Sequence, residues 1–230
     1  MSEGLKKIYP HLAPTYELIN HLLTLGLDIR WRKKAVQEAA RTKGHLWLDM
    51  CSGTGEMAQL LSQKAPKGVS IISSDFCLPM LQRAFHKKYS SLVYFALSQA
   101  NQLPFPDNSL DLITISFATR NLSPSRTLLN AHFQEIYRIL KPGGRLVNLE
   151  TSQPSSWSIR RLFHFYIRLT VIPIGTFLSG SKPGYKYLSS SIPRFYSPDE
   201  FQAVLYQQGF KRVKYKSFFW GTTALHIAEK

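Results

Sequence analysis

From residue 46 onward, short apolar runs alternate with longer segments in which apolar residues recur every three or four positions. The short runs predict strands at residues 46–50, 69–74, 92–97, 110–116 and 144–150. The longer segments predict helices at residues 56–65, 78–88 and 125–140. Alternation of this kind is typical of an α/β fold, in which a parallel sheet carries helices on both faces.

Two further segments surround the predicted sheet. Apolar positions at helical spacing over residues 8–42 predict an N-terminal helical segment, residues 1–44. Residues 152–197 follow the fifth strand and form a basic, aromatic-rich insertion. The chain has the length of one ordinary domain, so we expect a single domain, 1–230, with residues 152–197 as an inserted cap.

Three further patterns predict where individual helices and strands begin and end. The Lys-Pro-Gly-Gly run at residues 141–144 predicts a sharp helix stop followed by a strand. Ser197, followed by proline and two acidic residues, is typical of a helix N-cap, and this helix should end at residues 207–209. The apolar runs 211–219 and 222–228 predict a closing hairpin.

The charge distribution points to a polyanionic partner. The chain has 29 Lys and Arg against 14 Asp and Glu, a net charge of +15. Between Thr151 and Pro198 there is no acidic residue, and basic residues alternate there with aromatic ones. This mixture favours a surface that lies at an anionic lipid headgroup layer. Nucleic acid is the rival explanation for the charge alone.

Residues 162–180 come close to the ~20 apolar residues that a membrane-crossing helix needs. However, His164, Arg168, Pro173 and Gly175 interrupt them, and a central arginine is costly in hydrocarbon. We therefore expect an interfacial helix or a substrate lid. From the two cysteines we expect no disulfide framework or metal cluster, and from residues 2–7 we expect no secretory leader. The expected location is cytoplasmic, peripherally at the inner face of the membrane, with no metal.

A glycine-containing turn carries the chemistry. Asp49 ends the first strand, residues 51–55 form a turn of small residues, and Asp75 follows Gly55 by twenty positions. Gly53 and Gly55 also fit a nicotinamide-binding turn, and an acidic residue at this distance accepts ribose hydroxyls in either case. A carboxylate directly before the glycines would oppose a pyrophosphate, but it suits a cofactor with an ammonium and a sulfonium. The pattern therefore favours S-adenosylmethionine.

Nearly the whole chain resembles the ubiquinone/menaquinone biosynthesis C-methyltransferases. The resemblance lies in residues 13–20, 26–32, 100–107, 117–122, 140–146, 185–192 and 209–215. It implies a Rossmann-like class I methyltransferase sheet. The most particular features are the adjacent Arg120 and Asn121 and the Tyr-Lys-Tyr-Leu segment that begins at Tyr185. The chain departs from the family pattern at Glu56, where the family has Asp, at residues 99–101, and at Asp28 and Ile29, where it has His-Arg.

The predicted cofactor residues cluster at the ends of the first three strands. We expect Asp49 and the turn at the amino-acid end, Asp75 at the ribose, and Gln99 at the adenine. The full set is Asp49, Gly53, Thr54, Gly55, Asp75, Phe76, Gln99 and Ala100.

For catalysis the resemblance implies Arg120 and Asn121, with a structural salt bridge between Arg120 and Glu150 as the alternative. Arginine stays protonated, so Arg120 would stabilise a phenolate or hold a water rather than act as a base. Tyr16, Tyr185 and Tyr187 are candidate substrate contacts.

The implied reaction is methylation of a ring carbon of a polyprenyl quinol, with demethylmenaquinol favoured over the benzoquinol precursor of ubiquinone. Another hydrophobic acceptor is the chief alternative. Nucleic acid methylation is disfavoured because the Asn/Asp-Pro-Pro-aromatic signature and a catalytic cysteine pair are missing. A membrane-binding protein without enzymatic activity would not need the carboxylates and glycines of the turn. The assembly state, homodimer included, is left open.

Overall fold

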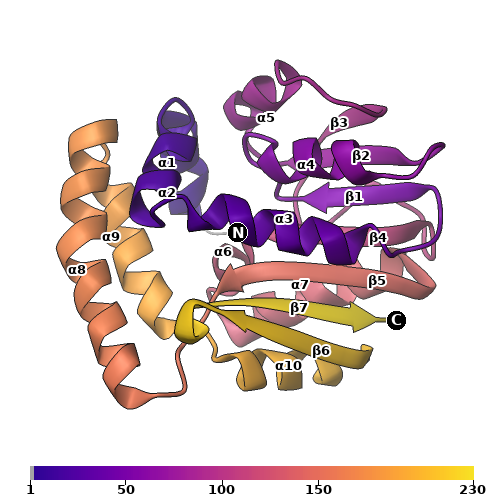
Figure 1. The fold of residues 1–230 in the computed structure, drawn as a ribbon. Coiled ribbons are helices and arrows are strands. Elements are labelled where there is room, and N and C mark those ends of the chain that lie inside the picture. The colour runs from indigo at the N-terminus through magenta and orange to yellow at the C-terminus, as the bar shows by residue number, and fades with distance from the viewer. Residues whose placement is uncertain (1–2) are drawn as a thin grey trace.

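The computed structural model describes residues 3–230, with side chains from residue 8 onward. Its centre is one sheet of seven strands in the order β3-β2-β1-β4-β5-β7-β6 (Figure 1). The strands are β1 Leu46–Met50, β2 Ser70–Asp75, β3 Val93–Leu97, β4 Leu110–Ser116, β5 Leu140–Thr151, β6 Lys211–Phe218 and β7 Thr223–Glu229. The first five strands are parallel, while β7 runs antiparallel to β5 and β6. The expected α/β sheet and closing hairpin are confirmed.

Helices cover both faces of the sheet because each buries an apolar stripe against it. One face is packed by α7 Arg126–Ile139 and α10 Pro198–Gln207, through Phe133 and Phe201. The other is packed by α3 Leu27–Ala39 and α4 Glu56–Lys64, through Trp31 and Leu61. The predicted helix from Ser197 is confirmed, and its capping box is complete, with Glu200 closing back onto Ser197.

A third apolar cluster lies beyond the sheet and joins the N-terminal segment to the insertion. It involves α1 Glu3–Leu12, α2 Tyr16–Leu23, α5 Leu78–Phe85, α8 Trp157–Ser179 and α9 Lys182–Ser191. In Figure 1, α8 and α9 stand together at one edge of the molecule, and α1 and α2 lie between them and the rest. The long predicted helical stretch is therefore three helices, α1 to α3, broken near Pro14 and Gly26.

Two predicted boundaries of the sheet and its helices differ from the structure by three residues or more. Helix α7 ends at Ile139 and a strand follows, as the Lys-Pro-Gly-Gly run predicted, but β5 begins at Leu140, four residues earlier than predicted. The register with β4 shifts there, and Gly143 and Gly144 exchange backbone hydrogen bonds with Lys230. Pairing with segments distant in sequence therefore extends β5 back to the end of α7. Helix α5 ends at Phe85, three residues earlier than predicted.

Candidate functional site

The strand order creates a crevice at the carboxyl ends of β1, β2 and β4. Strand β1 lies between β2 and β4, so the chain leaves β1 and β4 towards opposite sides of the sheet. Ligands of open α/β sheets bind at such a switch point. Asp49 near the end of β1 and Asp75 at the end of β2 line one cavity here, together with residues of the turn. The sheet thus brings together residues that are 26 positions apart in the chain.

The glycines of the turn have different roles. Gly53 has a φ of +56° and nothing within 4 Å of the position that a Cβ would occupy, so its backbone faces open space in the cavity. Gly55 has a φ of +83°, and a Cβ there would meet the Ala84 side chain at 2.7 Å. Gly53 fits its predicted place at a ligand, whereas Gly55 packs the turn against α5 and does not line the cavity. Thr54, also predicted, is buried and lines it.

Asp75 holds the turn in shape. Its carboxylate accepts the backbone N–H of Gly53 and of Cys77, each at 2.9 Å. Burial raises the pKa of Asp75 even though these N–H groups favour its charged form. A carboxylate has about four lone-pair positions, so Asp75 retains acceptor capacity for the hydroxyls of a ribose.

Among the buried side-chain atoms that lack a hydrogen-bond partner in the described chain, the one carboxylate oxygen belongs to Asp49. Its Oδ1 accepts the Thr114 hydroxyl at 2.8 Å, while its Oδ2 is buried without a hydrogen bond among the residues the structure describes. Burial raises the pKa of Asp49 to about 7. An unpaired buried carboxylate oxygen costs free energy, and a cationic group placed in the cavity would remove that cost. The ammonium of S-adenosylmethionine fits this requirement.

A second, smaller cavity adjoins the first at the end of β3. Its lining includes Asp75, Phe76, Gln99 and Ala100, which are the residues predicted for the ribose and adenine. Phe76 lines both cavities and meets the Tyr9 ring edge-on, with centroids 5.9 Å apart. The structure therefore gathers the predicted cofactor residues other than Gly55 around two connected hollows. Their binding roles remain predictions.

Arg120 lies on α6 Thr119–Leu122, a short helix directly after β4. Its Nη1 donates to Glu150 Oε1 and to Thr151 Oγ1, each at 3.1 Å, and its backbone N–H donates to Glu150 Oε2. The salt bridge weighed as an alternative is thus present. It leaves Arg120 Nε buried and without a hydrogen bond within the described chain. The guanidinium is anchored at one end and has a free donor at the other.

Asn121 projects differently from its neighbour. Arg120 lines a large cavity on the side of the cap. Asn121 instead lines the first cavity, the one that contains Asp49 and Asp75 and is called the cofactor cavity below. The Asn121 Nδ2 donates to the Tyr9 hydroxyl at 2.5 Å, and its Oδ1 is buried without a partner in the described part of the chain. The two residues predicted to act together therefore face the two sides of one wall.

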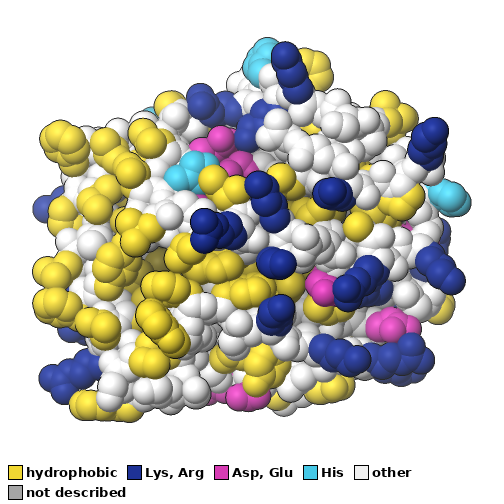
Figure 2. All heavy atoms as spheres, in the orientation of Figure 1, with side chains coloured by type: hydrophobic (Ala, Val, Ile, Leu, Met, Phe, Trp, Pro, Cys, Tyr) yellow, Lys and Arg dark blue, Asp and Glu magenta, His cyan; other side chains and the backbone are white. Residues whose placement is uncertain are grey.

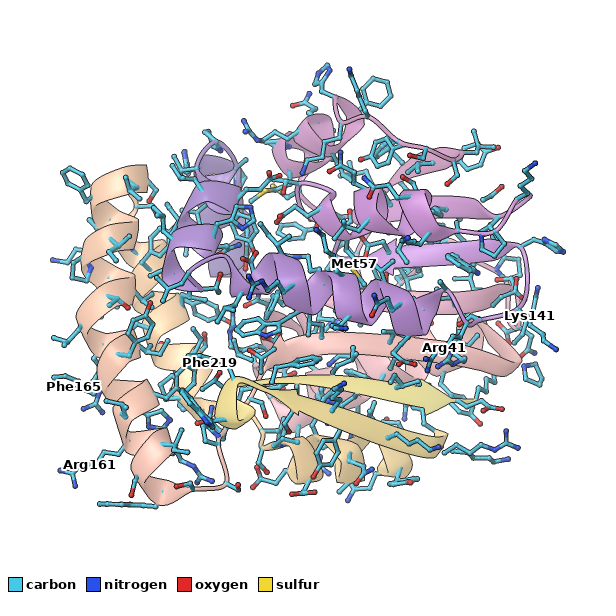
Figure 3. All side chains as sticks on the ribbon, viewed as in Figure 1. Arg41, Met57, Lys141, Arg161, Phe165 and Phe219 are labelled. Carbon is cyan, nitrogen blue, oxygen red and sulfur yellow. The ribbon has the colours of Figure 1, made fainter. Side chains whose placement is uncertain are left out.

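The large cavity is apolar and has a volume of about 470 Å³. It is bounded by α1, α2, α3, α8, α9 and the 3-10 helix Phe219–Gly221, and Tyr16, Tyr185 and Tyr187 all line it. Leu25 and Trp220, two exposed apolar side chains, also belong to its lining. Figure 2 shows hydrophobic side chains gathered on this face over α8 and the neighbouring helices, and Figure 3 shows Phe219 directed toward α8 and α9.

Four side chains line both the cofactor cavity and the large apolar cavity, namely Tyr9, Tyr16, Arg32 and Phe117. These four residues form the wall between the two cavities. Of these, Tyr9, Arg32 and Phe117 were not predicted as site residues. Tyr9 belongs to a helical apolar pattern, whereas Arg32 and Phe117 lie in the family segments 26–32 and 117–122, in which neither had an assigned role. Burial raises the pKa of Tyr9 well above its usual value, so its hydroxyl keeps its proton at neutral pH.

Asp28, which departs from the family pattern, lies next to Arg32 of this wall. Asp28 is buried, accepts from the Thr24 hydroxyl at 2.7 Å, and pairs with His21 at 2.9 Å and with Arg32. His21, Asp28 and Glu56 have ligand atoms within 4.8 Å of one another. The Arg32 guanidinium already pairs with both carboxylates, so this cluster holds a protein cation. Ile29 is partly exposed on α3, and nothing in the structure explains that substitution.

Solved structures share this fold. A methyltransferase from Aquifex aeolicus described as SAM-dependent matches with a TM-score of 0.58 and 20% identity, over 86% of this chain and 88% of that one. The [4+2]-cyclase SpnF matches with a TM-score of 0.69 and 15% identity, over 98% and 94%. The fold is thus that of class I methyltransferases, and the second match shows that the fold alone does not fix the reaction.

Sequence comparison identifies the family. The model of the ubiE/COQ5 methyltransferase family matches residues 1–230, and this chain belongs to that family. The demethylmenaquinone methyltransferase of Thermus thermophilus is 35% identical over 97% of this chain and 100% of its own length. The ubiquinone/menaquinone biosynthesis C-methyltransferase UbiE of Geotalea daltonii is 33% identical, over 99% and 97%. The family resemblance inferred from the motifs is confirmed.

Proposed function

We propose that this protein transfers a methyl group from S-adenosylmethionine to a ring carbon of a polyprenyl quinol, with demethylmenaquinol as the favoured acceptor. The observation that carries the proposal is the shared wall between a polar cavity with an unpaired carboxylate and an apolar cavity of about 470 Å³. The names of the full-length relatives support the same reaction.

The larger cavity suits a prenylated aromatic ring better than a polar substrate. Aromatic and aliphatic side chains dominate its lining, and burying an apolar tail against them is favourable by about 25 cal/mol per Å². Arg120, Thr151 and Tyr187 supply polar groups at the inner end, next to α6. A quinol offers hydroxyls for these groups and an apolar body for the rest.

When bound, S-adenosylmethionine supplies an already activated methyl group. The chain's own task is then alignment of the acceptor and stabilisation of an electron-rich ring. Arg120 is held by Glu150 and has its Nε free, so it can donate to a quinol oxygen as the hydroxyl loses its proton to water. Tyr9, whose pKa is raised by burial, serves as a hydrogen-bond donor rather than a base. Alignment by such a wall can contribute about 7–11 kcal/mol.

The outer face of α8 favours work at a membrane surface. This helix is the one in the described chain that is long and apolar enough to cross a membrane by length and composition. However, Ile167, Val171 and Gly175 are buried against the protein, and Gly175 packs against the Tyr185 ring. One face of α8 is therefore occupied by protein, as in an interfacial helix and unlike a free membrane span.

Exposed apolar and basic residues share the other face of α8. Trp157, Leu162, Phe165, Leu169 and Phe177 are exposed by 57–88%. Arg161 and Phe165 project away from the molecule in Figure 3, and Arg160, Arg161 and Arg168 line a shallow hollow with Trp157. Basic side chains beside exposed aromatics complement anionic headgroups above an apolar layer. We infer peripheral attachment of the cap to an anionic membrane, with the cavity receiving its substrate from there.

Methyl transfer tests the proposed activity directly. Labelled S-adenosylmethionine is incubated with short-tailed demethylmenaquinol and with its benzoquinol counterpart, both kept reduced, and the product mass is measured. A gain of one methyl on either ring supports the proposal, and the ratio of the two rates identifies the acceptor. Tight cofactor binding with no transfer to either quinol would contradict it and favour another hydrophobic acceptor.

A further inference from the structure

Arg32 is the one cationic side chain among the described residues that line the cofactor cavity. It is 4% exposed, and its guanidinium lies 5.1 Å from the centre of the Phe117 ring. The same cavity contains the carboxylates of Asp49, Glu56 and Asp75. A buried arginine among carboxylates and aromatic rings has a fixed orientation, whereas an exposed lysine is flexible and hydrated.

Contacts of Asp28 hold the Arg32 guanidinium in place on α3. Arg32 Nη1 donates to Asp28 Oδ2, and Asp28 is held in turn by the Thr24 hydroxyl and by His21. Burial raises the pKa of Asp28, but the charge of Arg32 and the Thr24 hydroxyl outweigh it and bring that pKa below its usual value. Asp28 is therefore an ionised anchor that orients Arg32.

Arg32 keeps donors available. A guanidinium has five N–H groups, and the hydrogen bond to Asp28 is the one that Arg32 forms within the described chain. The contact between its Nη2 and Glu56 Oε2 is an ion pair at 3.3 Å. Burial raises the pKa of Glu56, so this carboxylate is a weaker competitor for Arg32 than Asp28.

The amino-acid end of S-adenosylmethionine carries a carboxylate and an ammonium. Asp49 Oδ2 matches the ammonium, and the carboxylate requires a charged donor in the same cavity. We propose that Arg32 binds the cofactor's α-carboxylate and that Asp28 is the residue that positions it. This inference rests on the proposed function, because it takes S-adenosylmethionine as the cofactor.

Decarboxylated S-adenosylmethionine is the discriminating probe, since it keeps the adenosine, sulfonium and ammonium and lacks only the carboxylate. In isothermal titration of the wild type, the dissociation constant of the complete cofactor should be lower than that of the decarboxylated one by tenfold or more. Arg32→Gln should bring the ratio of the two dissociation constants close to one. Lys33→Gln, at the exposed neighbouring position, should leave that ratio unchanged.

Arg32→Gln leaves Asp28 buried without its cation and can lower the folded fraction. The double variant Asp28→Asn/Arg32→Gln removes both charges, and the affinity ratio is measured within one preparation, so loss of folded protein does not mimic the effect. Asp28→Asn alone should lower the ratio partially and Arg32→Lys should partly restore it. A wild-type ratio that survives in both Arg32→Gln and the double variant would overturn the inference. Failure of the wild type to bind S-adenosylmethionine at all would instead contradict the proposed function.

Discussion

The two cavities were built in different ways. The cofactor cavity is lined mainly by strand ends and one turn next to β1, β2 and β4, and helices such as α3 add single side chains, Arg32 among them. The apolar cavity is bounded mainly by helices from the two flanking segments, with the 3-10 helix Phe219–Gly221 at one side. Some of its lining residues are more than 180 positions apart, such as Ile8 and Ile192. The first depends on sheet geometry and polar pairing, and the second on helices whose packing leaves a hollow. This difference predicts that the two functions can be damaged separately, except at the wall they share.

The strongest separation is expected at Arg120. Arg120→Lys keeps a positive charge beside Glu150 but loses the free Nε donor, so the turnover number for quinol methylation should fall about 100- to 1000-fold. The dissociation constant of the cofactor should stay within about twofold, because Arg120 lines the other cavity. Arg126→Lys, at an exposed position, is the matched control. Equal losses in cofactor binding and turnover would show that the wall does not separate the two tasks.

Asp49→Asn should act on the opposite side of the wall. Loss of the charge that faces the ammonium should weaken cofactor binding about 10- to 100-fold, measured by titration calorimetry. In the wild type, affinity should fall as the pH drops below about 7, where Asp49 takes up a proton, and this dependence should disappear in the variant. Asp107→Asn, at an exposed carboxylate, should change neither property.

The same Asp49 substitution should stabilise the protein without cofactor. Asp49 ionises near its ordinary pKa in the unfolded chain but only near pH 7 in the folded one. The free energy of unfolding therefore decreases as the pH rises from the ordinary pKa to about 7. At pH 8 Asp49→Asn should raise the free energy of unfolding by about 2–4 kcal/mol. Denaturant unfolding at pH 8 checks this, and a destabilised variant would show that Asp49 is paired in the absence of cofactor.

Filling the apolar cavity should affect only the acceptor. Ile159 lines it from the first turn of α8, whereas Ser158 beside it is exposed. Ile159→Trp should raise the KM for a prenylated quinol about tenfold, or ~1.4 kcal/mol, with the cofactor dissociation constant unchanged. Ser158→Trp, the control, should leave both constants as they are. Unchanged kinetics in Ile159→Trp would place the acceptor elsewhere.

The membrane surface should be separable from both cavities. Combining Phe165→Ser with Arg161→Gln should reduce partitioning onto vesicles of anionic phospholipid about tenfold or more, because an exposed aromatic and one basic residue are lost. Methylation of a short-tailed quinol in detergent-free solution should be retained. Leu92→Ser, an exposed apolar residue before β3, is the control. Equal vesicle binding by all three proteins would exclude α8 as the contact.

The smallest effect is expected in the turn. Cys51 has a φ of +56°, a left-handed conformation that glycine adopts more easily. Cys51→Gly should relieve that strain while adding entropy to the unfolded chain, for a net stabilisation of about 0.5 kcal/mol. Thermal unfolding measures the sign. A decrease in stability would mean that the packing of the thiol outweighs the backbone strain.

Local patterns in the sequence determined the order of helices and strands, the turn at residues 51–55, and the carboxylates Asp49 and Asp75 that end up around one cavity. These features depend on residues close together in the chain and on the general geometry of parallel sheets, so they can be predicted without coordinates. The family-specific pair of Arg120 and Asn121 was also recognisable, although its division between two cavities was not.

Only the tertiary structure decided how distant segments meet. Tyr9 reaches Asn121 across 112 positions, and the first part of β5 pairs with Lys230. The ion-pair cluster around Asp28 forms only because the packing of α2, α3 and α4 brings His21, Arg32 and Glu56 together. The physical reason is that burial, charge pairing and a hollow between helices arise from the packing of segments that carry no local signal of one another.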